Sequence, residues 1–169
     1  IWFYIGEPFE KKIKPAIKKS RKDLKIISLL RNENLLLNHC PHCDKDTHLW
    51  LSPKRVIQQT ALIKDSLQQI YPQKKDRFEK NYADFLEKLK DLDNYHEKTL
   101  PRGKTLLVSH PAFSYFCKDY SMTQVSLEEK GKPLSAKKLQ EILHLIKKEK
   151  IPFVLTQPQI NQLLAKKVS

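Results

Sequence analysis

The order of apolar segments constrains the fold of this chain more than any other feature. A continuous apolar run at residues 1–5 ends at Gly6, and a helical repeat from Pro8 to Lys19 leads to a second apolar run at residues 24–30. Strands joined through a helix in this way lie parallel in one sheet, with the helix packed on its face. We therefore predict a β-α-β unit whose first strand is buried on both faces.

The second half of the chain repeats this order. Short strands are predicted at residues 105–109, 120–125 and 151–155, and a last helix is predicted beyond Pro158. Ser135 is a suitable N-cap for an intervening helix with one apolar face. The apolar positions of that helix are Leu139, Ile142, Leu143 and Ile146. A second β-α-β unit is therefore expected.

The longest predicted helix, from Lys74 to Lys98, joins the two halves. Its apolar residues recur at helical spacing and form one stripe: Phe78, Tyr82, Phe85, Leu89 and Leu92. At ~1.5 Å per residue this helix is roughly 35 Å long, enough to run beside a whole lobe. We predict an α/β protein with two parallel-sheet lobes, residues 1–73 and 101–169, joined by a helix at residues 74–100, with a cleft between the lobes.

The net charge is strongly positive. Lys and Arg number 32 and Asp and Glu number 19, which gives +13. Such a balance is typical of proteins that bind nucleic acid or anionic membranes, but also of well-solvated helices. The basic residues are spread over the predicted helices instead of forming one block, which favours the solvated surface: Lys11, Lys12, Lys18, Lys19, Lys74, Lys75, Lys137, Lys138, Lys147, Lys148, Lys166 and Lys167.

Two segments carry the residues that point to a function. Residues 46–53 place His48 just before a predicted helix with Ser52 as N-cap and Pro53 at its first position. Residues 108–116 place His110 just after a predicted strand. A histidine at the end of a rigid element can hold a metal ion in a fixed direction. Both are candidate ligands of one metal ion.

Neighbours of His48 have candidate supporting roles. Trp50 is expected to pack beneath His48 and set its orientation. Asp46 is either a hydrogen-bond partner that orients the imidazole or a cap of the loop.

These segments resemble the metal-binding solute receptors of ABC importers, in the zinc and manganese group. Asp46-Thr47-His48-Leu49-Trp50-Leu51-Ser52-Pro53 resembles the family signature D-P-H-x-W-L-D-P, and residues 108–116 are similar to its segment at the start of the second lobe. Residues 131–139 and 153–159 are similar to the stretch G-x-P-S-x-x-x-L … E-P-Q. The resemblance covers nearly the whole chain in the family's order, and the long helix lies where the family has a rigid interlobe helix.

The resemblance implies an extracytoplasmic receptor that binds a divalent metal between two lobes and delivers it to an ABC permease. His48 and His110 match two ligand positions, and His110 favours zinc over manganese because imidazole suits Zn²⁺. The family's other two ligands would precede Ile1 and follow Ser169, so we expect a piece of a longer protein. Such a receptor is expected to be a monomer that is held at the membrane by its contact with the permease. It is expected to have no enzymatic activity and no nucleic-acid partner.

A short loop before His48 is a candidate accessory metal site. It holds His39, Cys40, His42 and Cys43, and a Cys-x-x-C pair binds Zn²⁺ as thiolates. An exposed loop or a small disulfide fits the same residues. The remaining cysteine, Cys117, lies in an apolar stretch and is expected to be buried.

The composition also fits two other functional classes. A basic nucleic-acid-binding protein with a Cys/His zinc knuckle requires a clustered basic face and salt-sensitive binding. A zinc enzyme requires a Glu or Asp general base beside His48 or His110, and neither segment offers one. His96 and His144 are expected to be exposed.

Overall fold

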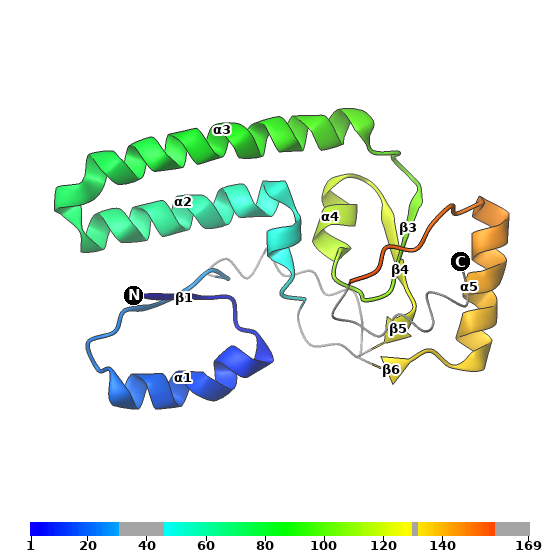
Figure 1. Cartoon of the computed structure of the whole chain (residues 1–169), viewed down its shortest axis with the longest axis horizontal. Coiled ribbons are helices and arrows are strands. Elements are labelled where there is room, and N and C mark those ends of the chain that lie inside the picture. The colour runs from blue at the N-terminus through cyan, green and yellow to red at the C-terminus, as the bar shows by residue number, and fades with distance from the viewer. Residues whose placement is uncertain (31–45, 130–131, 158–169) are drawn as a thin grey trace. The chain divides into compact units, whose positions relative to one another are not determined.

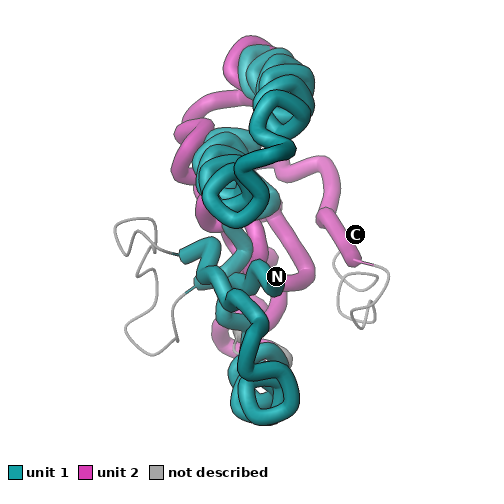
Figure 2. Tube along the Cα trace, turned by 90° about the vertical axis from the view of Figure 1, so that its left-hand side faces the viewer, with its two compact units in different colours: residues 1–94 teal, residues 95–169 magenta. Residues whose placement is uncertain are grey.

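The computed structural model describes residues 1–30, 46–129 and 132–157. The chain divides into two compact units, residues 1–94 and residues 95–169, which Figure 2 colours separately. The division falls within the long helix. The three-part division into residues 1–73, 74–100 and 101–169 stays a prediction.

Unit 1 begins with the predicted β-α-β order. Strand β1 (Trp2–Tyr4), helix α1 (Pro8–Ser20) and strand β2 (Ile26–Ser28) follow one another, and β1 pairs with β2 in parallel. Both strands are half-buried along their length, and Ile1 is 38% exposed. The prediction of a first strand buried on both faces is therefore wrong. Within the described residues this sheet has only two strands, so each has an unpaired edge.

The turn between β1 and α1 is held by backbone hydrogen bonds to one carboxylate. Gly6 has φ +100°, a left-handed conformation that glycine adopts without strain. Glu7 is the N-cap of α1 and forms a capping box with Glu10. The Glu10 carboxylate accepts from the amides of Ile5 (3.1 Å), Gly6 (2.7 Å) and Glu7 (2.9 Å). This turn fixes the carboxyl end of β1.

Two helices complete unit 1. A 3-10 turn, η2 (Leu49–Leu51), precedes α2 (Pro53–Ile70), and η3 (Pro72–Lys74) leads into α3 (Lys75–Thr99). The long predicted helix is thus confirmed. Figure 1 shows α2 and α3 side by side, and polar contacts join them: Lys64 Nζ lies 3.5 Å from Glu79 Oε2, and Gln68 Nε2 donates to the same oxygen at 2.9 Å.

The predicted apolar stripe of α3 is only partly correct. Leu89 is buried, at 8% exposure, and Phe78 and Tyr82 are half-buried. Phe85 and Leu92 are 45% and 43% exposed, so the prediction is wrong for these two residues.

Unit 2 contains a second parallel pair. Strand β3 (Thr105–Val108), helix α4 (Ser114–Asp119) and strand β4 (Thr123–Ser126) follow in order, and β3 pairs with β4 in parallel. The short α4 was not predicted. Helix α5 (Ala136–Glu149) has Ser135 as its N-cap, as predicted. The Ser135 hydroxyl accepts a hydrogen bond from the Lys138 amide.

The core of unit 2 lies under β3. Leu107 and Leu127 are almost fully buried, at 1% and 2% exposure. Half-buried apolar side chains from β4, α5 and the chain beyond α5 pack against them: Val125, Ile142, Ile146, Ile151 and Val154. Burial of this cluster fixes where the ends of β3 and β4 lie.

Unit 2 departs from the sequence prediction at two places. The strand predicted at residues 151–155 is reduced to a single bridge, in which Leu155 pairs with Val108 in parallel. A short antiparallel hairpin, β5 (Glu128–Glu129) with β6 (Lys132–Pro133), was not predicted, whereas the β3–β4 pair is parallel as expected. The hairpin residues lack the apolar alternation that marks a strand. The last predicted helix, beyond Pro158, lies outside the described residues.

Candidate metal centre

The His48 side chain is fixed by a carboxylate two residues before it. Asp46 Oδ1 lies 2.8 Å from His48 Nδ1 and also accepts from the His48 backbone amide at 3.0 Å. An ionised carboxylate only accepts hydrogen bonds, so a neutral imidazole in this contact carries its proton on Nδ1 and its lone pair on Nε2. Asp46 thus contacts both the imidazole and the backbone of His48, and its role as an orienting partner of a metal ligand stays a prediction.

A second contact ties this loop to α1. The Thr47 hydroxyl donates to the carboxylate of Glu7, which directly follows the turn after β1. The His48 segment is therefore anchored at the carboxyl end of β1. Ligands of parallel α/β sheets bind at this edge.

Burial below the loop comes from leucine instead of tryptophan. Leu49 is fully buried, at 0% exposure, and so is Ser52, the N-cap of α2. Trp50 is 42% exposed, and its ring centre lies 5.2 Å from that of His48 at a tilt of 49°. Trp50 thus contacts the imidazole without lying beneath it in the core. Whether it sets the orientation of His48 stays a prediction.

His110 is the candidate ligand in unit 2. It follows β3 by two residues, and the backbone before it is held because the Ser109 amide donates to the Leu155 carbonyl at 2.9 Å. Beyond it, the Ala112 amide donates to the His110 carbonyl at 2.8 Å. The imidazole is half-buried, with 26% of its side chain exposed. It lies at the carboxyl end of a parallel strand, whereas His48 precedes the helical turn η2.

The partner of His110 is a residue that the sequence interpretation missed. The His110 Nδ1 atom is hydrogen-bonded to Glu128 Oε1, 18 positions further along the chain. In the parallel register Val108 pairs with Ser126, and two residues beyond each lie His110 and Glu128. The Leu127 amide extends the ladder by donating to the Val108 carbonyl at 2.9 Å. The register could have pointed to Glu128, but the predicted strand ended at Val125.

The predicted accessory site cannot be compared with the structure. His39, Cys40, His42 and Cys43 lie outside the described residues. Among the residues that are described, no group of three or more His, Cys, Asp and Glu side chains is arranged to hold a metal ion. A surface hollow beside β2 and α2 is lined by Lys25, Ile26, Ile27, Ser66, Gln69 and Ile70, with no metal-ligating side chain among them.

The other histidines and Cys117 behave differently from one another. His144 is exposed, as predicted. His96 is half-buried, with its ring centre 5.3 Å and 5.2 Å from those of Phe116 and Tyr120, so the prediction of a surface residue is wrong. Cys117 is buried as expected, and burial raises the pKa of its thiol to about 12. A thiol so hard to ionise is a poor nucleophile and a poor metal ligand.

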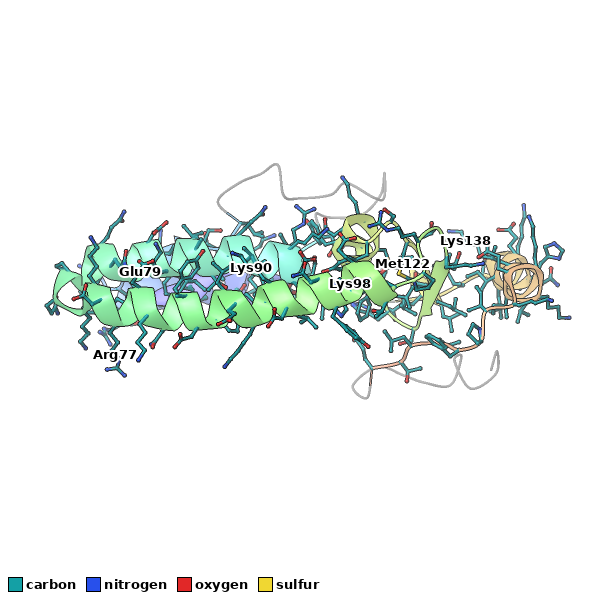
Figure 3. All side chains as sticks on the ribbon, turned by 90° about the horizontal axis from the view of Figure 1, so that it is seen from above. Arg77, Glu79, Lys90, Lys98, Met122 and Lys138 are labelled. Atoms are coloured by element: carbon teal, nitrogen blue, oxygen red, sulfur yellow. The ribbon has the colours of Figure 1, made fainter. Side chains whose placement is uncertain are left out.

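Most of the described basic residues are exposed. All ten of the described lysines named for their spread along the chain are exposed. Figure 3 labels Arg77, Glu79 and Lys90 on α3, where acidic and basic side chains alternate on exposed positions. No helix of the described part is both long and apolar enough to cross a membrane. The spread of charge favours a solvated helical surface over a nucleic-acid interface.

Comparison with known proteins identifies the family. The family model described as "Zinc-uptake complex component A periplasmic" matches residues 1–169. The chain belongs to this family. The resemblance found in the residues around His48 and His110 is thereby confirmed at the family level, and the comparisons give the nucleic-acid alternative no support.

Individual relatives agree with this family. The chain is 38% identical over 133 residues to the "Zinc-binding lipoprotein AdcA" of Streptococcus pneumoniae, covering 76% of this chain and 26% of that protein. A crystal structure of ZnuA matches with a TM-score of 0.86 at 27% identity, over 98% of this chain and 65% of that one. A Zn(II)-bound AdcA structure from Streptococcus pneumoniae matches with a TM-score of 0.71 at 32% identity, over 99% and 37%. The chain thus spans about a quarter of the length of that curated relative.

Proposed function

We propose that this chain is part of an extracytoplasmic receptor that binds a divalent transition metal, zinc in preference to manganese, and delivers it to an ABC permease. One observation carries the proposal. In each unit, an imidazole beside the end of a helix or strand is hydrogen-bonded through Nδ1 to a carboxylate: His48 precedes η2 and α2, and His110 follows β3. The family membership and the zinc-binding relatives support the same function.

The chemistry of the two imidazoles suits a metal ligand. Histidines that bind metals almost always donate their other ring N–H to a carboxylate, a carbonyl or water, which fixes the tautomer and strengthens the donor atom. Asp46 and Glu128 provide such carboxylates for His48 and His110. We propose that Nε2 of each ring coordinates the ion.

Zinc is the preferred metal because both proposed ligands are nitrogen donors. Imidazole suits Zn²⁺, whereas Mn²⁺ prefers carboxylate and water oxygen. A tetrahedral site requires more than two ligands, so two imidazoles hold the ion only together with further groups. The receptor performs no reaction of its own: the metal is cargo that is bound and released.

The partners follow from that role. A receptor of this kind works outside the cytoplasm, in the periplasm or at the membrane surface, and contacts its permease; we propose that it does so as a monomer. We also propose the division into lobes at residues 1–73 and 101–169 with a helix at residues 74–100. The loop with His39, Cys40, His42 and Cys43 is proposed as an accessory zinc site.

Zinc titration of His48→Ala and His110→Ala, made in the full-length protein, tests the proposal. Each substitution is expected to weaken zinc binding by at least about 100-fold, because even groups that only orient a ligand contribute about 10- to 100-fold. His144→Ala is the matched control, since His144 is exposed on α5. Affinity is measured by competition with a chromogenic chelator, and equal affinity in all three variants would refute the proposal.

A second set of measurements tests which metal the protein prefers and whether imidazole is the ligand. Protons compete with the metal for imidazole, so zinc affinity is expected to be lower at about pH 5.5 than at about pH 7.5. Manganese titration of the same protein should give weaker binding than zinc. Equal zinc affinity at both pH values would exclude imidazole as the main ligand.

A further inference from the structure

We propose that Glu128 is the positioning residue of His110: its carboxylate holds the imidazole as the Nδ1–H tautomer and aims Nε2 at the metal. This inference rests on the proposed function. It assigns a role to a residue in β5, a hairpin strand outside both histidine segments. Nothing in the local sequence around His110 indicates such a partner.

Hydrogen bonds and burial hold the backbone on both sides of Glu128. The preceding residue, Leu127, is buried at 2% exposure, and its amide continues the β3–β4 ladder to Val108 at 2.9 Å. The Ser126 hydroxyl donates to the Glu128 carbonyl at 2.7 Å, and Glu128 pairs with Pro133 across the hairpin. These contacts hold the backbone of Glu128 beside the end of β3, where its carboxylate meets His110.

The surroundings of the pair strengthen the contact. The side chains of His110 and Glu128 are 26% and 17% exposed, so water competes only in part for either group. A charge-assisted hydrogen bond is stronger than a neutral one, and more so where solvent is partly excluded. The negative charge raises the electron density of the ring and makes its second nitrogen a better donor to a cation.

The arrangement in unit 1 is an independent example of the same device. Asp46 Oδ1 lies 2.8 Å from His48 Nδ1, and this carboxylate is 13% exposed. Two units with unrelated local sequences thus pair the same imidazole nitrogen with a carboxylate. The recurrence favours a metal-directed role over a chance ion pair.

The test uses Glu128→Ala and Glu128→Gln in the full-length protein, with Glu141→Ala as control because Glu141 is exposed on α5. The tautomer of His110 is read from the ¹⁵N chemical shifts of its ring in metal-free protein. Wild type is expected to show the proton on Nδ1, and Glu128→Ala is expected to shift the population toward the Nε2–H form. An unchanged tautomer in Glu128→Ala would overturn the inference.

Zinc affinity is measured on the same variants with Zn²⁺ and a chromogenic chelator. Glu128→Ala is expected to bind zinc about 10- to 100-fold more weakly, the range found for residues that orient metal ligands. Glu128→Gln keeps an acceptor oxygen for Nδ1–H and should recover much of that loss. If Glu128→Gln keeps the Nδ1–H tautomer yet loses as much zinc affinity as Glu128→Ala, control of the tautomer does not set the affinity and the positioning role is wrong.

The outcomes separate this inference from the proposed function. If His48→Ala and His110→Ala lower zinc affinity while Glu128→Ala matches the Glu141→Ala control, the receptor function stands and only the role of Glu128 fails. If none of the histidine variants changes zinc binding, the function itself fails, and the positioning role with it. Thermal unfolding of each variant establishes that a loss of affinity does not come from a loss of fold.

Discussion

The two histidine–carboxylate pairs differ in how the chain brings them together. Asp46 and His48 are two residues apart, and a single turn joins them. His110 and Glu128 are 18 residues apart and meet only because β3 and β4 pair in one parallel register. The same contact is thus made once by local backbone geometry and once by tertiary structure. The first should tolerate damage to the surrounding core, and the second should not.

The largest expected effect comes from the core under β3. Leu107→Ala should destabilise the protein by about 2–5 kcal/mol, because it leaves a cavity beside Leu127. The loss should also disrupt the His110–Glu128 pair while the Asp46–His48 turn persists. Denaturant unfolding measures the stability, and the ring ¹⁵N shifts of His48 and His110 report each pair.

Leu92→Ala is the matched control for this substitution, since Leu92 is 43% exposed on α3 and should change stability little. Equal perturbation of both histidines by Leu107→Ala would contradict the difference between a local and a non-local pair.

Removal of the local carboxylate should affect zinc binding without unfolding the protein. Asp46→Ala is expected to weaken zinc binding about 10- to 100-fold, as a residue that orients a ligand. Asp46→Asn keeps an acceptor oxygen and should lose less. Chelator competition measures both, and Asp84→Ala, at an exposed position of α3, is the control. A larger loss from Glu128→Ala than from Asp46→Ala would indicate that the non-local pair dominates.

A substitution in the turn that follows His110 should lower the free energy of unfolding by less than Leu107→Ala does. The Phe113 amide donates to Gln124 Oε1 at 2.5 Å, and Gln124 Nε2 donates to the Ser114 hydroxyl at 3.2 Å. Gln124→Met leaves the Phe113 amide without this acceptor and should cost about 1–3 kcal/mol. Urea unfolding gives the change in free energy. A neutral result would mean that water replaces the side chain and that this turn does not depend on β4.

The smallest effect at neutral pH is expected at Cys117. Burial raises the pKa of its thiol from 9.0 to about 12, so the folded state disfavours the thiolate. The unfolded chain loses this proton first as pH rises, and stability should therefore fall between about pH 9 and pH 12. Cys117→Ala should lack this part of the alkaline loss. Unfolding of both proteins over that pH range measures the difference, and parallel curves would contradict the expectation.

Much of the fold was predictable because it depends on local patterns. The parallel β-α-β order of unit 1, the long helix, and the starts of α2 and α5 at Ser52 and Ser135 all follow from apolar spacing and capping residues. The failures share one cause. Each depends on what packs against a segment, which the sequence of that segment does not encode. The three cases are the partial burial of β1, the exposure of Phe85 and Leu92, and the reduction of residues 151–155 to one bridge.

For the candidate site, the sequence by itself determined the Asp46–His48 contact, because a hydrogen bond across two residues follows from the local turn. The metal-ligand roles of His48 and His110 stay predictions. Only the tertiary structure decided that Glu128 faces His110, that Trp50 remains exposed, and that His96 lies among aromatic rings. The physical reason is the distance along the sequence over which each contact is determined. Turns and helix caps are fixed by neighbouring residues, whereas a contact between strands depends on a register that the whole core selects.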